Sequence, residues 1–410
     1  MQQEKPAPLK VLFIVNRLYE WSQNFITREL TELNELGVDM AIAARDKAVR
    51  HDLSPQEKKL ESKYQRIENV PFTPKYLWRN IQMALSRPGR YFGAWRTLFS
   101  LKHRPSKFFR GLVCLFRAGG LVRFAEQNGF NLIHAHFLTA AGETALYLSK
   151  MTGIPWGATA YAMDIYVDNS GLQGKLRHAT YVNGTTKFNE AFMAKLVPEQ
   201  PEKIVTRYYG IHTSATMPPP IPHPVFTFVA VGRLVEKKGF RYLLEACAAL
   251  KQKGYQFRCE IYGKGPLETE LRQQITALGL TENIGLGGYI APNDMPTMYR
   301  SGDVLAAPCV IASNGDVDGL PNVCLEAMDC GLPVISTTIS GIPEGVEDGV
   351  NGWLVPPNDA AKLAGAMEKA LLSKDLLSMR YASHRIASEK FDVRKNVLLI
   401  RDLLEAHRLR

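Results

Sequence analysis

Short apolar, β-branched segments alternate with helical stretches along the whole chain, and this alternation limits the possible folds more than any other feature. Most of these segments are nearly continuous apolar runs, as expected for parallel strands that helices cover on both faces. The strand candidates are Leu9–Val15, Asp39–Ala43, Asn131–Ala135, Trp156–Ala160, Ala179–Asn183, Phe226–Val231, Phe257–Tyr262, Asp303–Ala307 and Pro333–Thr337. Alternating strands and helices predict doubly wound parallel sheets of the α/β class.

A proline-rich stretch at residues 218–224 divides this pattern into two halves. Prolines stiffen a chain and fit neither helix interiors nor sheet ladders. A chain of 410 residues also exceeds what one hydrophobic core usually holds. We therefore predict two Rossmann-like domains, at residues 1–217 and 225–390, that face each other across a cleft. We expect residues 391–410 to form a helix that packs back on the first domain.

The net charge of +10 is concentrated in one segment. Residues 71–125 contain eleven Lys and Arg and no Asp or Glu, and the cations alternate with large aromatic side chains. We predict that this segment is a basic helical insertion in the first domain. Such a mixture suits the surface of an anionic membrane.

Two other interpretations of residues 71–125 remain. Basic and aromatic residues also serve nucleic-acid binding, and a helical insertion can have an apolar core and merely solvated charges. The absence of any acid disfavours the solvated interpretation, because solvated helix faces usually mix charges of both signs. We favour peripheral binding to the inner face of the cytoplasmic membrane, with no nucleic-acid partner.

Nothing in the sequence predicts a membrane span or a metal centre built from cysteines. The apolar run Val11–Val15 is too short for the core of a signal peptide, and no stretch approaches the roughly 18 apolar residues of a spanning helix. The six cysteines form no Cys-x-x-Cys pair, which favours free thiols in a reducing compartment. We expect a cytoplasmic protein.

The chemistry of the second half begins at residues 232–240, Gly-Arg-Leu-Val-Glu-Lys-Lys-Gly-Phe. This segment joins a predicted strand to an amphipathic helix, so Arg233 and Lys238 lie near a helix N-terminus. Such an end favours anions, and two added cations suit a diphosphate. The alternative is that the lysines are ordinary solvated charges.

A second segment, residues 316–326, carries the carboxylates Asp318 and Glu326. Pro321 suits the first turn of a helix, which places Asp318 before the helix and Glu326 inside it. Two separated carboxylates can hold hydroxyls at both ends of an elongated ligand. The alternative is a solvated acidic loop next to a glutamate on a helix face, but the apolar neighbours of Glu326 disfavour it.

Two metal interpretations of the same segment are less consistent with the sequence. Asn314-x-Asp316-x-Asp318-Gly resembles the opening of a calcium loop, but Leu325 stands where the bidentate glutamate should fall. Asp316-x-Asp318 could also be a metal-binding Asp-x-Asp motif, but such a motif ends a strand in a single-domain fold, whereas here it precedes a helix in a chain of two domains. We predict no metal and no cofactor.

Glycine turns follow the strand candidate Phe257–Tyr262 and another apolar stretch. Gly263 opens one, and Gly287-Gly288-Tyr289-Ile290 forms the other. Either could admit a base or a ribose, or could be only a tight turn.

Together these spacings resemble the retaining GT-B glycosyltransferases of family four. The likeness is strongest to the branch that builds bacterial exopolysaccharides such as colanic acid and amylovoran. The matching strings are VGRLVEKKGF, IYGKGPLE, GDVDGLPNVCLEAMDCGLPVISTTISGIPE and NGWLVPPND.

The resemblance implies a role for each residue of the second half. Arg233 and Lys238 should bind the donor diphosphate, and Glu326 the ribose. Asp318 takes the place of an acid, usually Glu, that contacts the donor sugar. The donor-binding residues that complete the set are Gly263, Ile290, Leu320 and Asn322.

In the first half, residues 131–137 read Asn-Leu-Ile-His-Ala-His-Phe and match a string of the same family. His134 and His136 should share one face of a strand, with His136 nearer the cleft, where it packs or contacts a substrate. A metal-binding His-x-His has no further ligand in the sequence to support it. Tyr161 stands where the family commonly has a histidine near the donor sugar.

The resemblance implies transfer of a hexose, with retention, from a nucleotide-diphosphate sugar to a glycan or polyprenyl-diphosphate-linked acceptor. The alternatives are a catalytically silent, membrane-recruited subunit that binds the donor, or a sugar-nucleotide epimerase or phosphorylase on the same fold.

Overall fold

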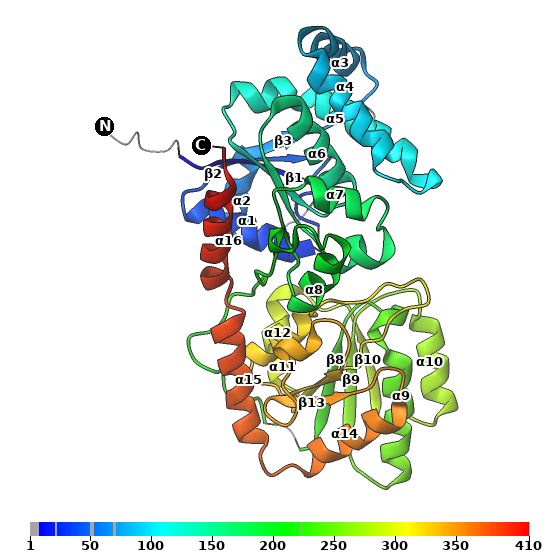
Figure 1. Cartoon of the computed structure of the whole chain (residues 1–410). Helices are drawn as coiled ribbons and strands as arrows, with labels where there is room; N and C mark the ends of the chain where they lie inside the picture. Colours follow the sequence, from blue (N-terminus) through cyan, green and yellow to red (C-terminus); the bar gives the residue numbers. More distant parts are fainter. Residues whose placement is uncertain (1–7, 21–22, 50–52, 69–70, 223, 410) are drawn as a thin grey trace. The chain divides into compact units, whose positions relative to one another are not determined.

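The computed structural model describes residues 8–20, 23–49, 53–68, 71–222 and 224–409 (Figure 1). The chain divides into two compact units. Unit 1 comprises residues up to 209 together with those from 393 onward, and unit 2 comprises Gly210–Asp392. The division therefore lies shortly before the proline-rich stretch, of which His223 is outside the described residues.

The described part of unit 1 is built on a seven-stranded parallel sheet with the order β3-β2-β1-β4-β5-β6-β7. Its strands are β1 (Lys10–Val15), β2 (Asp39–Ala44), β3 (Tyr64–Arg66), β4 (Leu132–His136), β5 (Trp156–Thr159), β6 (Tyr181–Asn183) and β7 (Ile204–Val205). The central strands are buried, because apolar residues point to both faces and helices cover both.

The α-helices described in unit 1 connect and cover these strands (Figure 1). They are α1 (Asn24–Glu35), α2 (Pro55–Lys59), α3 (Pro74–Ser86), α4 (Pro88–Ser100), α5 (Pro105–Gln127), α6 (Ala140–Thr152), α7 (Leu172–His178), α8 (Lys187–Leu196) and α16 (Val393–His407). Helix α16 belongs to unit 1 although it comes last in the sequence. Its apolar residues Val397, Ile400, Leu403 and Leu404 share a core with β1 and α1.

Helices α3, α4 and α5 make up the basic segment between β3 and β4. Each begins with a proline, which suits the first helical turn because its missing N–H has no intrahelical partner there. Side chains such as Tyr91 and Leu98 are buried in the core of unit 1, whereas Trp78, Phe92 and Phe109 are exposed. The segment is therefore a packed part of unit 1 with an aromatic outer surface.

The eleven cations of this segment are not all on that surface. Arg117 is buried, Arg110 pairs with Glu143 and Asp168, and Arg79 donates to the carbonyl of Gly120 at 2.7 Å. Part of the positive charge of this segment therefore holds elements of unit 1 together and does not belong to an external surface.

The described part of unit 2 is built on a six-stranded parallel sheet with the order β10-β9-β8-β11-β12-β13. Its strands are β8 (Thr227–Val231), β9 (Arg258–Tyr262), β10 (Ile284–Gly288), β11 (Val304–Ala307), β12 (Val334–Thr337) and β13 (Gly352–Val355). Its α-helices are α9 (Phe240–Gln252), α10 (Glu268–Ala277), α11 (Met295–Arg300), α12 (Asn322–Asp329), α13 (Ile342–Gly345), α14 (Ala360–Leu372) and α15 (Leu376–Lys390).

The predicted pair of doubly wound parallel sheets is confirmed. Both sheets start from an inner strand, proceed outward on one side, and then cross back to the other side. All nine strand candidates correspond to observed strands. The predicted cleft between the two domains stays a prediction. Among the described residues, no helix has the length and apolar character needed to cross a bilayer.

Candidate functional site

The carboxyl ends of β8 and β11 lie side by side in unit 2, where the strand order reverses. The loop of residues 232–239 follows β8, and the loop of residues 308–321 follows β11. Ligands of open α/β sheets bind outside such a reversal point, because the loops diverge there. The structure thus brings the two predicted chemical segments of unit 2 to one edge of one sheet.

Two glycines allow the backbone to pack tightly at this edge. A Cβ on Gly263, whose φ is +143°, would lie 1.8 Å from the carbonyl oxygen of Gly232. A Cβ on Gly239, whose φ is +68°, would lie 1.9 Å from the carbonyl oxygen of Pro308. Since a backbone atom blocks each position, only glycine fits. The end of β9 and the loop after β11 therefore both press against the loop after β8.

Lysines and aspartates of these two loops form a compact ion cluster. Lys238 Nζ lies 2.6 Å from Asp318 Oδ2, and Lys237 Nζ lies 2.9 Å from Asp316 Oδ1 and 3.1 Å from Asp318 Oδ1. The side chains of Lys238 and Asp318 are only 14% and 17% exposed. The structure therefore joins directly two residues to which the sequence assigns different parts of one ligand.

Burial and close pairing shift the pKa values of Lys238 and Asp318 in opposite directions. Burial alone would raise the pKa of Asp318, but attraction to Lys238 and Lys237 outweighs it and holds the pKa at about 2. Burial would likewise lower the pKa of Lys238, but Asp318 shifts it above its usual value. Both side chains are fully charged near pH 7, and each neutralises the other.

The other predicted donor residues lie on neighbouring elements of unit 2. Glu326 lies on α12, where its Oε2 accepts a hydrogen bond from the Tyr299 hydroxyl at 3.3 Å. Leu320 is buried just before α12, and Asn322 begins that helix with a buried side-chain oxygen that has no hydrogen-bond partner among the described residues. Ile290 is half-buried after β10.

Arg233 is exposed at the start of the loop after β8. Its guanidinium is thus open to a ligand, whereas the amine of Lys238 is engaged by Asp318.

In unit 1, His134 and His136 lie on β4 with their ring centroids 5.1 Å apart. Both rings are on one face of the strand, as the alternation of side chains predicts. The rings are fully buried, and Glu29 from α1 approaches them, with its Oε1 3.6 Å from His136 Nε2. Glu29 could not be identified from the sequence, because no local pattern distinguishes this glutamate from the other glutamates of the same helix.

These three residues are the one group of possible metal ligands in the described part of the chain. The expectation that His-x-His has no third ligand is therefore wrong. However, His134 already bonds through both nitrogens, to the Tyr181 hydroxyl at 2.7 Å and to the Thr159 hydroxyl at 3.1 Å. A metal at His134 would have to displace one of these partners, so His134 itself suits a hydrogen-bonded core better than a metal centre.

Burial makes this cluster neutral. It lowers the pKa of His134 to about 3 and that of His136 well below its usual value, where the neighbouring His134 adds to the effect. Burial also raises the pKa of Glu29 to about 8. Near pH 7 the group therefore consists mainly of two neutral imidazoles and a protonated carboxyl.

Tyr161 connects this cluster to the end of β5. Its hydroxyl lies 3.0 Å from His136 Nδ1, and its backbone N–H donates to Asp164 Oδ2 at 3.1 Å. Because His136 is fully buried, its ring has no open path to a ligand in this structure. This geometry favours His136 as a group that holds Tyr161 in place.

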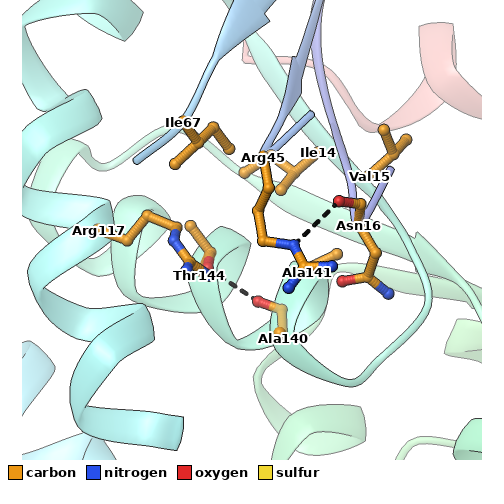
Figure 2. Close-up of a pocket in the computed structure, with 9 residues that line it drawn as sticks. All are labelled: Ile14, Val15, Asn16, Arg45, Ile67, Arg117, Ala140, Ala141 and Thr144. Carbon is orange, nitrogen blue, oxygen red and sulfur yellow. Dashed lines mark hydrogen bonds between the residues drawn. The ribbon is translucent and has the colours of Figure 1, made fainter. Parts of the chain in front are cut away.

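A small pocket in unit 1 opens beside β1 (Figure 2). It is lined by Ile14, Val15, Asn16, Arg45, Ile67, Arg117, Ala140, Ala141 and Thr144. These residues come from the carboxyl ends of β1, β2 and β3, from α5 and from the first turns of α6. Sequence reasoning counted Arg117 only as part of the basic segment and missed Arg45, although Arg45 directly follows an apolar strand, where ligand-binding residues often stand.

Comparisons with known proteins agree with the geometry of unit 2. Residues 218–385 match the family model described as glycosyl transferases group 1. These residues form a glycosyltransferase group 1 domain. All the donor residues predicted from the sequence, from Arg233 to Glu326, lie inside this group 1 domain.

Two curated relatives are similar to the chain over part of their length. A putative colanic acid biosynthesis glycosyltransferase, WcaL of Escherichia coli K12, is 40% identical over 165 residues, which are 40% of this chain and 41% of WcaL. The amylovoran biosynthesis glycosyltransferase AmsK of Erwinia amylovora is 39% identical over 145 residues, or 35% and 36% of the two chains. The aligned part thus spans about two fifths of each relative.

A solved structure extends the likeness to the whole fold. The Anabaena protein HepE, in complex with UDP, superposes with a TM-score of 0.69 over 97% of this chain and 100% of its own, at 18% identity. The fold is therefore the GT-B type that the sequence predicts. The His136–Tyr161 cluster and the Arg45 pocket both lie outside the group 1 domain, in unit 1.

Proposed function

We propose that this chain transfers a hexose from a nucleotide-diphosphate sugar to a glycan or polyprenyl-diphosphate-linked acceptor, with retention of configuration. The observation that carries this proposal is the Lys238–Asp318 pair at the strand-order reversal of a group 1 domain. The names of the relatives favour a place in the synthesis of an exopolysaccharide or a related surface glycan.

The ion cluster supplies a physical route for donor binding. A diphosphate that binds beside the loop after β8 would contact the exposed guanidinium of Arg233. It would also compete with Asp318 for the amine of Lys238. The two cations then stabilise the diphosphate as it departs with its negative charge. Asp318, released from Lys238, becomes available to accept a hydrogen bond from a sugar hydroxyl.

Retention then follows if attack and departure occur on the same face of the sugar. The bond from the anomeric carbon to the phosphate oxygen breaks, and a bond to the acceptor oxygen forms. The proton of the acceptor hydroxyl passes to the departing diphosphate oxygen. Arginine, lysine and the helix end supply the positive charge, so the proposed reaction requires no metal and no further cofactor.

Tyr161 favours a second candidate, a subunit that binds the donor without turnover. Burial, with a smaller effect from Glu29, raises the pKa of its hydroxyl well above the usual value, so the group stays neutral. A neutral phenol can donate one hydrogen bond, but it has no charge to share with a phosphate.

One experiment separates these candidates. Purified protein is incubated with UDP-, GDP- and ADP-sugars, with and without a polyprenyl-diphosphate-linked acceptor, and release of nucleoside diphosphate is measured. Acceptor-dependent release with one donor supports the transferase. Donor binding by calorimetry without any release would support the silent subunit and overturn the transferase.

We also propose that helices α3–α5 bind the inner face of an anionic membrane. Trp78, Ile81 and Leu85 form an exposed row on α3 at helical spacing, and Phe92 and Phe99 do so on α4. Exposed aromatics and cations together suit lipid headgroups, where each cation can contribute about 1 kcal/mol at low salt.

Vesicle sedimentation tests this surface. The variant Lys75→Ser/Arg96→Ser/Arg123→Ser removes cations that are exposed on α3, α4 and α5. It should bind vesicles containing phosphatidylglycerol less than the parent, with nucleotide affinity unchanged. A matched control replaces three exposed lysines of unit 2, which are Lys362, Lys369 and Lys374. Equal binding by parent, variant and control would refute the membrane role.

A further inference from the structure

The pocket of Figure 2 has a charge distribution that the donor site in unit 2 does not share. Two arginines line it, Arg45 and Arg117, and none of its nine lining residues is an acid. Figure 2 shows the two side chains reaching into the pocket from different sides. The donor site, by contrast, neutralises its lysines with aspartates.

Backbone carbonyls hold both guanidinium groups in place. Arg45 Nε donates to the carbonyl of Asn16 at 3.3 Å, and Arg117 Nε donates to the carbonyl of Glu68 at 3.2 Å. Asp46, the acid next to Arg45 in the sequence, pairs with Arg17 instead. Among the described residues, no carboxylate forms an ion pair with Arg45.

The two cations also influence each other. Arg117 is only 6% exposed. Burial lowers the pKa of its guanidinium, and the positive charge of Arg45 also lowers it. Both guanidinium groups line the same pocket, so the charge of Arg45 disfavours the charged form of Arg117, and an anion between them would oppose that effect.

The remaining walls add to this preference. Ala140 and Ala141 belong to the first turn of α6, a helix of 13 residues whose N-cap, Thr139, makes no side-chain capping bond. The N-terminus of a helix of this length favours negative charge. The pocket also opens at the carboxyl ends of β1, β2 and β3, next to the strand-order reversal of unit 1.

We propose that this pocket binds a phosphate group, and that this phosphate belongs to the sugar acceptor. The tetrahedral anion would lie between the guanidinium groups of Arg45 and Arg117 and the first turn of α6. Two guanidinium groups offer paired donors that match phosphate oxygens. The assignment to the acceptor rests on the proposed transferase function, whereas the phosphate site itself does not.

Binding measurements with three variants test the site. The probes are inorganic phosphate, glycerol 3-phosphate, and a short-chain polyprenyl diphosphate in neutral detergent. Arg45→Gln, which changes an exposed side chain, should weaken binding of the preferred probe roughly 10- to 100-fold, because a charged hydrogen bond is lost. Arg117→Lys should weaken it less, and Lys238→Ala, which alters the donor site, should leave it unchanged.

These outcomes separate the phosphate site from the transferase proposal. Binding weakened by Arg45→Gln but retained by Lys238→Ala assigns the phosphate to this pocket, even if no donor is ever turned over. The preferred probe shows whether the phosphate is soluble or lipid-borne. The reverse dependence would place the phosphate in the donor site and overturn the proposal, and so would equal binding by Arg45→Gln and the parent. Absence of saturable binding by the parent to any of the three probes would overturn it too.

Discussion

Each unit gathers ionisable side chains beside its parallel sheet, but the two units treat charge in opposite ways. In unit 2, Lys238 and Asp318 remain ionised because each neutralises the other. In unit 1, His134, His136 and Glu29 lie in a fully buried cluster that remains mainly neutral near pH 7. A site that binds a diphosphate needs charged side chains that can exchange one ionic partner for another. A neutral cluster can only orient its neighbours.

The largest effect should follow from removing the exchangeable charge. Lys238→Ala removes the charged contact proposed for the leaving diphosphate and should cost about 2–4 kcal/mol in transition-state stabilisation, or roughly 30- to 1,000-fold in kcat/KM. Lys237 still pairs with Asp318, so the domain should remain folded. Steady-state kinetics with the matched surface variant Lys362→Ala as control measure this loss. Unchanged kcat/KM in Lys238→Ala would remove the central support of the donor site.

A smaller effect should appear at Glu326, whose proposed contact to the ribose is made by a carboxylate rather than by a cation. Glu326→Gln should weaken binding of the free nucleotide about 10-fold, because a charged hydrogen bond to the ribose becomes a neutral one. The Tyr299 hydroxyl can still donate to an amide oxygen, so the local structure should survive. Calorimetry with the exposed unit 2 variant Glu282→Gln as control tests this. If Glu326→Gln binds nucleotide as tightly as the control does, the ribose role is wrong.

The same contrast explains what could be predicted from the sequence. In unit 2 the site residues lie in two short segments that join strands to helices, so local patterns locate Arg233, Lys238, Asp318 and Glu326 on their elements. Even here the direct pairing of Lys238 with Asp318 was not foreseeable, because it depends on the adjacency of β8 and β11. That adjacency is a property of the sheet order.

In unit 1 the site is assembled from distant segments. Glu29, His136 and Tyr161 come from α1, β4 and the end of β5, and no spacing in the sequence connects them. Strand β3 also escaped prediction, because Tyr64–Arg66 contains no apolar run. Its carboxyl end leads to Ile67, one wall of the Arg45 pocket, so missing the strand meant missing the pocket.

The neutral cluster should reveal itself in the pH dependence of stability. The pKa of Glu29 is raised to about 8 in the folded chain, from an ordinary value of 4.5. Between pH 4.5 and about 8 the folded state therefore binds more protons than the unfolded state. The stability that protonated Glu29 contributes is lost progressively as pH rises across this range, and the loss is complete once pH has passed about 8. The loss approaches about 1.4 kcal/mol per pH unit inside that window.

Glu29→Gln isolates this contribution, because glutamine is neutral at every pH. Denaturant unfolding at several pH values should show the variant gaining stability relative to the parent from pH 5 to pH 8, with no further change above about 8.5. The control, Glu202→Gln, changes an exposed acid of unit 1 and should keep a constant difference from the parent. A constant difference for Glu29→Gln as well would show that Glu29 is ionised in the folded protein, and the contrast between the two units would fail.

The last prediction is that removing divalent metal has no effect on activity. If Arg233 and Lys238 replace a divalent cation, excess EDTA should leave the rate of nucleoside diphosphate release unchanged. The pairing of Asp316 and Asp318 with two lysines supports this expectation, because each carboxylate already has a positive partner. An EDTA-treated sample with added magnesium or manganese serves as control. Loss of activity in EDTA with recovery on adding either metal would mean that a divalent cation replaces the two lysines as the partner of Asp316 and Asp318. The positive charge of the donor site would then come from outside the chain, and unit 2 would no longer differ from unit 1 by carrying its own exchangeable charge.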